Sequence, residues 1–294
     1  MESGQHEVKS ILQAVYNLIT KLITLRIHTI TMSSLSVTLI QANLFWENKK
    51  ANLEMLQRKI ESIEEKTEIV ILPEMFTTGF SMNCELLAEK MDGETVFWMK
   101  KMAADNKIIL TGSVIIEEDG KYFNRLIWML PNGEFGVYDK RHLFAFGNEH
   151  HHYSPGNKKL IASVKGWKIN LQICYDLRFP VWSRQNPGEF ENMYDLLINV
   201  ANWPEKRSIA WKPLLRARAI ENQCFVAGVN RVGEDGNKII YDGESCIIDP
   251  LGEIIYQKSK EEDVFTFSLQ KEKITETRNK FPFWKDADFF VITE

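Results

Sequence analysis

The stretch LQICYDLRFP, residues 171–180, joins the end of an apolar strand to a cysteine and two charged side chains. The preceding run from Lys168 to Ile173 has the pattern of a strand, so Cys174 is expected at the carboxyl edge of a sheet, where open α/β folds bind their ligands. A free cysteine is more often a buried packing residue. Asp176 and Arg178, however, give Cys174 polar neighbours that a packing thiol does not need. We therefore take Cys174 as a candidate nucleophile.

Strand-like and helix-like segments alternate along the chain after Met32, with hairpin turns at 118–120 and 131–133. The expected strands are 35–41, 68–72, 107–116, 121–130, 134–138, 168–173, 196–200, 224–230, 238–241, 245–248, 253–256 and 264–267. The expected helices are 48–63, 97–105 and 207–223. This order predicts a layered α/β protein with mixed sheets, and no linker divides residues 32–294 into smaller domains.

Residues 1–31 differ from the rest and are interpreted as an N-terminal extension. Lys9, Lys21 and Arg26 interrupt the apolar residues, so the segment is too polar for a transmembrane helix. It is either an additional amphipathic helix or a product of translation from a start codon upstream of Met32. The second interpretation is favoured because strand-like sequence begins at Leu35.

The composition excludes several classes of protein. The 294 residues carry 36 Lys and Arg against 40 Asp and Glu, a net charge of −4, without a long basic run. Binding to nucleic acid is therefore not expected. The four cysteines, at 84, 174, 224 and 246, include no CxxC pair and are too few for a disulfide scaffold. We expect a reducing, cytoplasmic setting, no membrane association, and packing roles for Cys224 and Cys246, with Cys84 in a loop.

Two more charged residues follow predicted strands. Glu74 comes directly after a buried strand and Pro73, and a carboxylate there is costly to bury unless it is paired. Lys140 follows the strand 134–138, and Glu149 lies nine residues further on. Solvated loop positions are the alternative for these residues. The adjacent histidines 150–152 lack the spacing of a zinc site, so no metal is expected.

Together, Glu74 in LPEMF, Lys140 in DKRHLF and Cys174 in CYDLRFP resemble the Glu–Lys–Cys triad of the nitrilase, or carbon–nitrogen hydrolase, superfamily. The similarity extends from about Ser34 to Phe267 and includes residues 201–236 and 241–255. The loop GNEHHHYSPG, residues 147–156, most resembles the bacterial YafV-type ω-amidases.

The resemblance implies a single-domain, four-layer α-β-β-α sandwich, no cofactor, and a homodimer or larger homo-oligomer that uses the helix 207–223. The aromatic C-terminal stretch 280–294 is expected to reach towards a partner. The reaction implied is hydrolysis of a small ω-amide, such as 2-oxoglutaramate or 2-oxosuccinamate, to the acid and ammonia. The alternatives are a nitrile, deaminated-glutathione or carbamoyl substrate, or a non-catalytic binding protein of the same fold.

The resemblance also implies a role for each residue of the site. Cys174 would attack the amide carbonyl, and Glu74 would carry its proton. Lys140 and the backbone N–H of Tyr175 would stabilise the oxyanion, with Glu149 orienting the lysine.

Three more residues are expected to bind the substrate. Arg178 either binds the substrate carboxylate or forms a salt bridge with a carboxylate such as Asp176. Trp203 and Phe144 are candidates to close the pocket, although core packing is the favoured role for Phe144.

Overall fold

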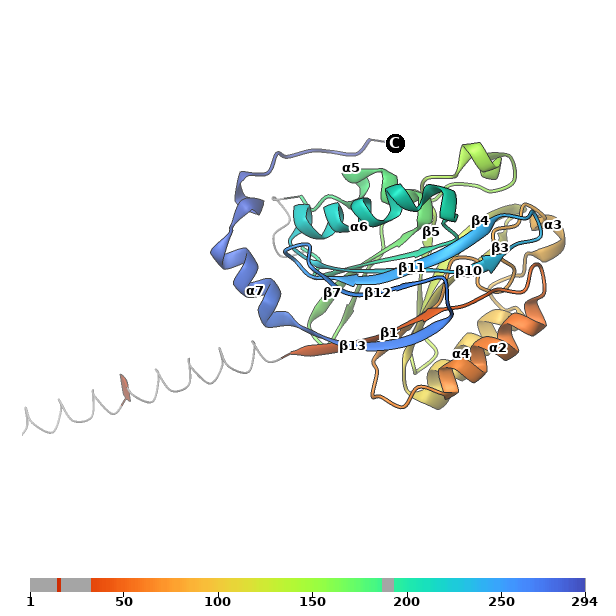
Figure 1. Ribbon diagram of the computed structural model, residues 1–294, viewed down its shortest axis with the longest axis horizontal. Coiled ribbons are helices and arrows are strands. Elements are labelled where there is room, and N and C mark those ends of the chain that lie inside the picture. Colours follow the sequence, from red (N-terminus) through yellow and green to blue (C-terminus); the bar gives the residue numbers. More distant parts are fainter. Residues whose placement is uncertain (1–14, 17–32, 187–192, 294) are drawn as a thin grey trace, which may run out of the picture.

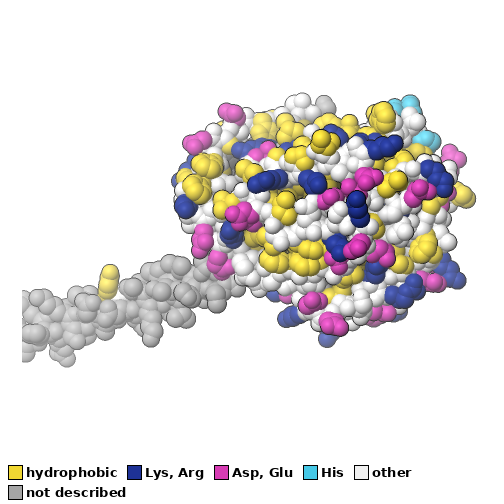
Figure 2. Space-filling view, viewed as in Figure 1, with side chains coloured by type: hydrophobic (Ala, Val, Ile, Leu, Met, Phe, Trp, Pro, Cys, Tyr) yellow, Lys and Arg dark blue, Asp and Glu magenta, His cyan; other side chains and the backbone are white. Residues whose placement is uncertain are grey.

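Two stacked β-sheets with helices on their outer faces form the protein (Figure 1). The computed structural model describes residues 15–16, 33–186 and 193–293. The predicted N-terminal extension, 1–31, lies almost wholly outside these residues, so the division of the chain at Met32 stays a prediction. Charges of both signs are interspersed on the face seen in Figure 2.

The first sheet has the strand order β13-β1-β2-β3-β4-β5, and the second has the order β10-β11-β9-β8-β7-β6, with β12 paired to β11. The strands are β1 (Ser34–Gln41), β2 (Ile69–Ile71), β3 (Ile109–Glu118), β4 (Lys121–Met129), β5 (Phe135–Asp139), β6 (Ile161–Val164), β7 (Trp167–Ile173), β8 (Leu196–Ala201), β9 (Phe225–Asn230), β10 (Val232–Glu234), β11 (Ile240–Ile248), β12 (Ile254–Ser259) and β13 (Asp263–Gln270). Both sheets are mixed, because parallel pairs such as β1–β2 and β7–β8 adjoin antiparallel ones.

Helices cover the outer face of each sheet. Helices α2 and α4 lie against the first sheet, and α5 and α6 lie against the second (Figure 1). The α-helices are α2 (Lys49–Glu61), α3 (Cys84–Leu87), α4 (Glu94–Asn106), α5 (Pro180–Ser183), α6 (Ser208–Asn222) and α7 (Lys271–Lys280). The expected four-layer α-β-β-α sandwich is confirmed.

The alternation of side chains along β1 shows how the layers are held together. Leu35, Val37 and Leu39 point into the core between the two sheets, whereas Ile40 points into the core beneath α2 and α4. Successive side chains of a strand face opposite sides, so one strand supplies both cores. The apolar side chains of α2 are buried on the same side, with Leu56 fully enclosed.

Several segments differ from the prediction. The strands β6 and β10 and the short helices α3 and α5 were not predicted. Residues 238–241 and 245–248 form parts of one strand, β11, because Gly243 and Glu244 adopt positive φ and make a β-bulge there instead of a turn. Helix α7 was not predicted, since only Ile274 and Thr277 of its ten residues are buried and it has no apolar stripe.

The C-terminal stretch, whose predicted contact with a partner stays a prediction, packs in part on its own chain. The side-chain amide of Asn186 donates to the backbone oxygen of Phe290 at 3.1 Å, and Ile292 packs against the core. These residues therefore pack on their own chain, as Figure 1 shows for the segment that returns over α5 and α6.

Candidate active site

The predicted triad residues each follow a strand end. Glu74 comes three residues after β2, Lys140 directly follows β5, and Cys174 directly follows β7. The stacking of the two sheets brings these strand ends together, although Glu74 and Lys140 belong to the first sheet and Cys174 to the second. Residues 100 positions apart thus meet at one site.

Lys140 lies between two buried carboxylates. Its Nζ is 2.9 Å from Glu74 Oε1 and 2.9 and 3.0 Å from the two carboxylate oxygens of Glu149. The side chains of Glu74 and Glu149 are fully buried and that of Lys140 is 1 % exposed. An unpaired charge at this depth would be strongly destabilising, so each of the three groups depends on the others.

Cys174 begins a short 3₁₀ helix, Cys174–Arg178, and is 9 % exposed. Its backbone has φ of +43°, which is uncommon for a residue with a Cβ and costs energy that the surroundings must supply. The turn is held by Asp176, which accepts hydrogen bonds from the backbone N–H of Ile173 and the hydroxyl of Tyr138. Asp176 therefore fixes the sharp exit from β7 that presents the thiol.

The charges of the site shift the pKa values of its members. Burial lowers the pKa of the Lys140 ammonium, but the two carboxylates outweigh burial and raise it above its ordinary value. Burial, followed by the charge of Glu74 and its hydrogen bond to the thiol, raises the pKa of Cys174. Burial also raises the pKa of Glu149. The resting site therefore holds a neutral thiol beside a charged ammonium.

Two asparagines that the sequence analysis did not identify complete this cluster. Asn124 on β4 donates from Nδ2 to Glu74 Oε1 at 2.8 Å. The backbone N–H of Asn202 donates to Glu74 Oε2 at 2.7 Å, and its carbonyl accepts from the Cys174 thiol at 3.9 Å. Asn202 directly follows the apolar strand β8, the same signal that identified Glu74.

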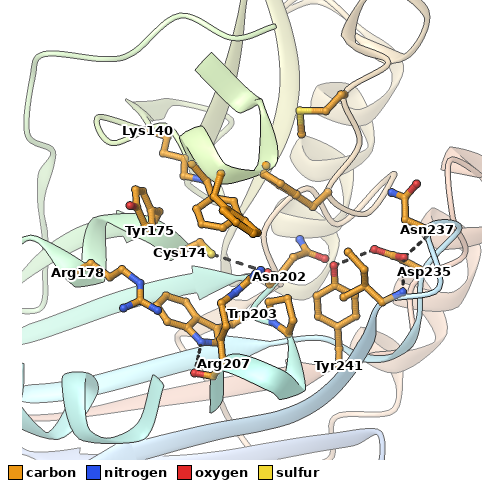
Figure 3. A pocket seen from close by; sticks show the side chains of 17 residues that line it. Lys140, Cys174, Tyr175, Arg178, Asn202, Trp203, Arg207, Asp235, Asn237 and Tyr241 are labelled. Atoms are coloured by element: carbon orange, nitrogen blue, oxygen red, sulfur yellow. Dashed lines mark hydrogen bonds between the residues drawn. The ribbon is translucent and has the colours of Figure 1, made fainter. Parts of the chain in front are cut away.

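A pocket of about 210 Å³ opens onto Cys174 and Lys140. This volume is below the ~300–1,000 Å³ of most sites for drug-sized ligands and suits a small metabolite. Figure 3 shows the side chains around it, several of them aromatic. The predicted residues Tyr175, Arg178, Trp203 and Phe144 all line this pocket, together with Arg207, Asp235 and Tyr241, which were not predicted.

Two of the predicted alternatives are wrong. Phe144 is not a core residue, because it is half-buried and lines the pocket, with its ring 5.0 Å from that of Tyr175. The salt bridge between Arg178 and Asp176 is not among the ion pairs of the described residues. Asp176 instead accepts from His142 Nδ1 at 2.8 Å, and the Arg178 guanidinium lies 4.8 Å from the centre of the Trp203 ring.

The other cysteines and the histidine run lie outside the chemistry. Cys224 and Cys246 are buried in the core, as expected, whereas Cys84 starts helix α3 instead of lying in a loop. His150 and His151 are exposed. Within the part of the chain that the structure describes, no group of His, Cys, Asp or Glu could hold a metal ion, and no helix is long and apolar enough to cross a membrane.

A buried nucleophile, a carboxylate beside it and a fixed ammonium are the groups needed for acyl transfer through a covalent intermediate. Residues 36–279 match the carbon-nitrogen hydrolase family, and the chain belongs to this family.

The similar proteins include amidases. The chain is 44 % identical over 260 residues to the omega-amidase YafV of Escherichia coli K12, covering 88 % of this chain and 99 % of that protein. It is 31 % identical to the 2-oxoglutaramate amidase of Bacillus subtilis, covering 85 % and 96 %. The crystal structure of XC1258 from Xanthomonas campestris, a protein of the same superfamily with an arsenic adduct in its active site, superposes with a TM-score of 0.87 at 44 % identity, covering 89 % of this chain and all of that one.

Proposed function

We propose that the protein is an ω-amidase that hydrolyses the terminal amide of a small 2-oxo acid, of the 2-oxoglutaramate or 2-oxosuccinamate class, to the acid and ammonia. The observation that carries this proposal is the buried cluster of Glu74, Lys140 and Cys174 at the base of a small pocket. The similarity to two amidases of this class over most of the chain supports it.

The first half of the reaction forms a thioester. Cys174 attacks the amide carbonyl carbon while Glu74 takes the thiol proton, so the raised pKa of the thiol is no obstacle. Lys140 and the backbone N–H of Tyr175 stabilise the oxygen as it becomes negative; one such donor is worth about 2.7–4 kcal/mol of barrier in related acyl-transfer sites. Glu74 then gives its proton to the nitrogen, and ammonia leaves.

The second half restores the enzyme. Glu74 accepts a proton from a water molecule that attacks the thioester, and the carboxylic acid departs as the proton returns to the Cys174 sulfur. Glu149 keeps the Lys140 ammonium in place in both halves through its two contacts. These steps need no metal or organic cofactor.

The substrate chain lies against the aromatic wall of the pocket in this proposal. Trp203 and Phe144 pack on its methylene groups, and Arg178 faces its carboxylate. Each of these residues lines the pocket beside Cys174.

The experiment is an ammonia-release assay on matched compounds: 2-oxoglutaramate, glutaramate, the corresponding ω-nitrile and an N-carbamoyl amino acid. We expect the ω-amides to be hydrolysed fastest, with no activity in Cys174→Ala. Faster release from the nitrile or the carbamoyl compound would favour the alternative substrate classes. Binding without hydrolysis of any of them would favour a non-catalytic protein.

We also propose that the chain forms homodimers through α6, in a reducing, cytoplasmic setting. The support for the dimer is that α6 exposes Ile209 (86 %) and Ile220 (49 %), with Leu251 exposed nearby. Light scattering after size exclusion should give twice the mass of one chain. The double substitution Ile209→Asp and Ile220→Asp should reduce this to one chain, and an unchanged mass would contradict this interface.

A further inference from the structure

Two arginines line the pocket without a partner for their charge. Arg178 and Arg207 are half-buried, and both contribute to the wall around Cys174. Among the described residues, neither guanidinium takes part in an ion pair or a hydrogen bond. Both are held only by aromatic faces: Arg178 lies 4.8 Å from the centre of the Trp203 ring, and Arg207 lies 4.8 Å from that of Phe144.

Two buried arginines elsewhere in the molecule contact carboxylates. Arg125 contacts the carboxylates of both Glu118 and Asp139, and Arg218 contacts Glu221 at 3.0 Å. A guanidinium carries five donors that suit a planar carboxylate. The two free guanidiniums of the pocket therefore present unsatisfied donors.

The carboxylates near the pocket have other partners. Asp235 lines the pocket, but it accepts from the Tyr241 hydroxyl at 2.9 Å and from the backbone N–H of Asn237 and Ile239. Glu74 and Glu149 are fully buried and held by Lys140. The accessible charge of the pocket wall is therefore positive.

Trp203 contacts both arginines and so holds them near each other. Its ring supports the Arg178 guanidinium, while its indole N–H donates to the backbone carbonyl of Arg207 at 2.9 Å. Arg207 ends a short 3₁₀ turn, Glu205–Arg207, directly before α6, which limits the movement of its backbone. Figure 3 shows both arginines beside Trp203, with Cys174 and Lys140 on the same pocket.

We propose that Arg207, acting with Arg178, binds the carboxylate at the end of the substrate opposite to the scissile amide, and that Arg207 selects anionic amides over neutral ones. This inference rests on the proposed function and assigns to Arg207 the restriction of the substrates to anionic amides. The ligand class is a monoamide of a short dicarboxylic acid, with or without a 2-oxo group. A paired guanidinium–carboxylate contact forms two parallel hydrogen bonds, which gives direction as well as affinity.

The test compares two ligands of nearly equal shape. Glutaramate carries a carboxylate at the end where glutaramide carries a neutral amide. Calorimetric titration of Cys174→Ala should show tighter binding of glutaramate. Adding Arg207→Met should weaken glutaramate binding about 10–100-fold, the range for a hydrogen bond to a charged group. Glutaramide binding should change less than threefold. The control is Arg216→Met, the same change at an exposed position of α6 outside the pocket, which should leave both affinities unaltered.

Kinetics of the enzyme with Cys174 intact give a second readout. Arg207→Met should raise KM for glutaramate by a similar factor and change kcat for glutaramide little. Equal losses for both ligands would mean that Arg207 only shapes the pocket, and unchanged glutaramate binding would also overturn the inference. The titrations use an inactive variant, so they test binding separately from hydrolysis. Tighter binding of glutaramate than of glutaramide, together with a wild type that hydrolyses neither, would contradict the proposed function but not this inference.

Discussion

The charged side chains at the base of the pocket are paired with one another, whereas those on its wall have no ion-pair partner among the described residues. At the base, Lys140 contacts two carboxylates and all three side chains are at most 1 % exposed. On the wall, Arg178 and Arg207 are half-buried and rest on aromatic rings. The base is complete before a substrate arrives, as a site that must stabilise a transition state should be. The wall is completed by the ligand, as a site that selects charge should be. Changes at the base should therefore alter stability and turnover, whereas changes on the wall should alter affinity.

Among changes to the charged groups of the base, the largest effect is expected at Lys140. Lys140→Met leaves two buried carboxylates facing each other without a cation, so we expect an activity loss of about 10²–10³-fold from the missing oxyanion donor. The free energy of unfolding should fall by about 3–5 kcal/mol for the broken buried pair. Urea denaturation and ammonia release measure the two effects. Unchanged stability would show that the base is not a charge-compensated cluster.

Glu149→Gln separates the loss of activity from the loss of stability. This substitution leaves Lys140 and Glu74 as a balanced pair, so stability should change by only about 1 kcal/mol. Turnover should fall about 10–100-fold, because the ammonium loses the carboxylate that contacts it through both oxygens. A stability loss as large as that of Lys140→Met would contradict the role assigned to Glu149.

The neutral state of the thiol is tested by its reactivity with pH. Because burial and Glu74 raise the pKa of Cys174, the thiolate fraction should grow about tenfold for each pH unit between 7 and 9. The rate of alkylation by iodoacetamide, followed by mass spectrometry of the peptide with Cys174, should rise accordingly without a plateau. A rate that is constant across this range would indicate a preformed thiolate.

A smaller effect is expected at Asn124, which contacts Glu74 as a neutral donor. Asn124→Ala removes one of the hydrogen bonds to Glu74 Oε1 but leaves Lys140 and the backbone N–H of Asn202 in place. We expect kcat to fall about tenfold or less, in line with about 0.5–1.5 kcal/mol for such a bond. Loss of all activity would give Asn124 a part in the chemistry itself.

The sequence indicated the base of the pocket better than its wall. Strand ends can be read from hydrophobic periodicity, and Glu74, Lys140 and Cys174 are polar residues that lie within three residues after such ends. Arg207 carries no local signal, because a lysine- and arginine-containing loop reads as a solvated surface until its three-dimensional neighbours are known. Asn124 likewise depends on the pairing of β4 with β5, where its backbone oxygen accepts from the Lys140 N–H at 3.0 Å.

The secondary structure was likewise predicted where the local sequence pattern is long, and not where tertiary contacts decide it. Apolar stripes predicted α2, α4 and α6 and most strands. The segment Asp242-Gly243-Glu244 has the composition of a turn, yet cross-strand pairing with β9 and β12 continues β11 past it. Tertiary contacts thus overrode local preference where the local pattern was short.

The most direct test is the rate of ammonia release from 2-oxoglutaramate by the wild type and by Cys174→Ala, with binding of glutaramate measured on Cys174→Ala. We predict that Cys174→Ala still binds the ligand and releases ammonia at least ~10⁴-fold more slowly than the wild type, as expected for the loss of a covalent nucleophile. As a control, Cys246→Ala removes a core thiol and should keep its turnover. Ammonia release by Cys174→Ala at the rate of the wild type would contradict the account.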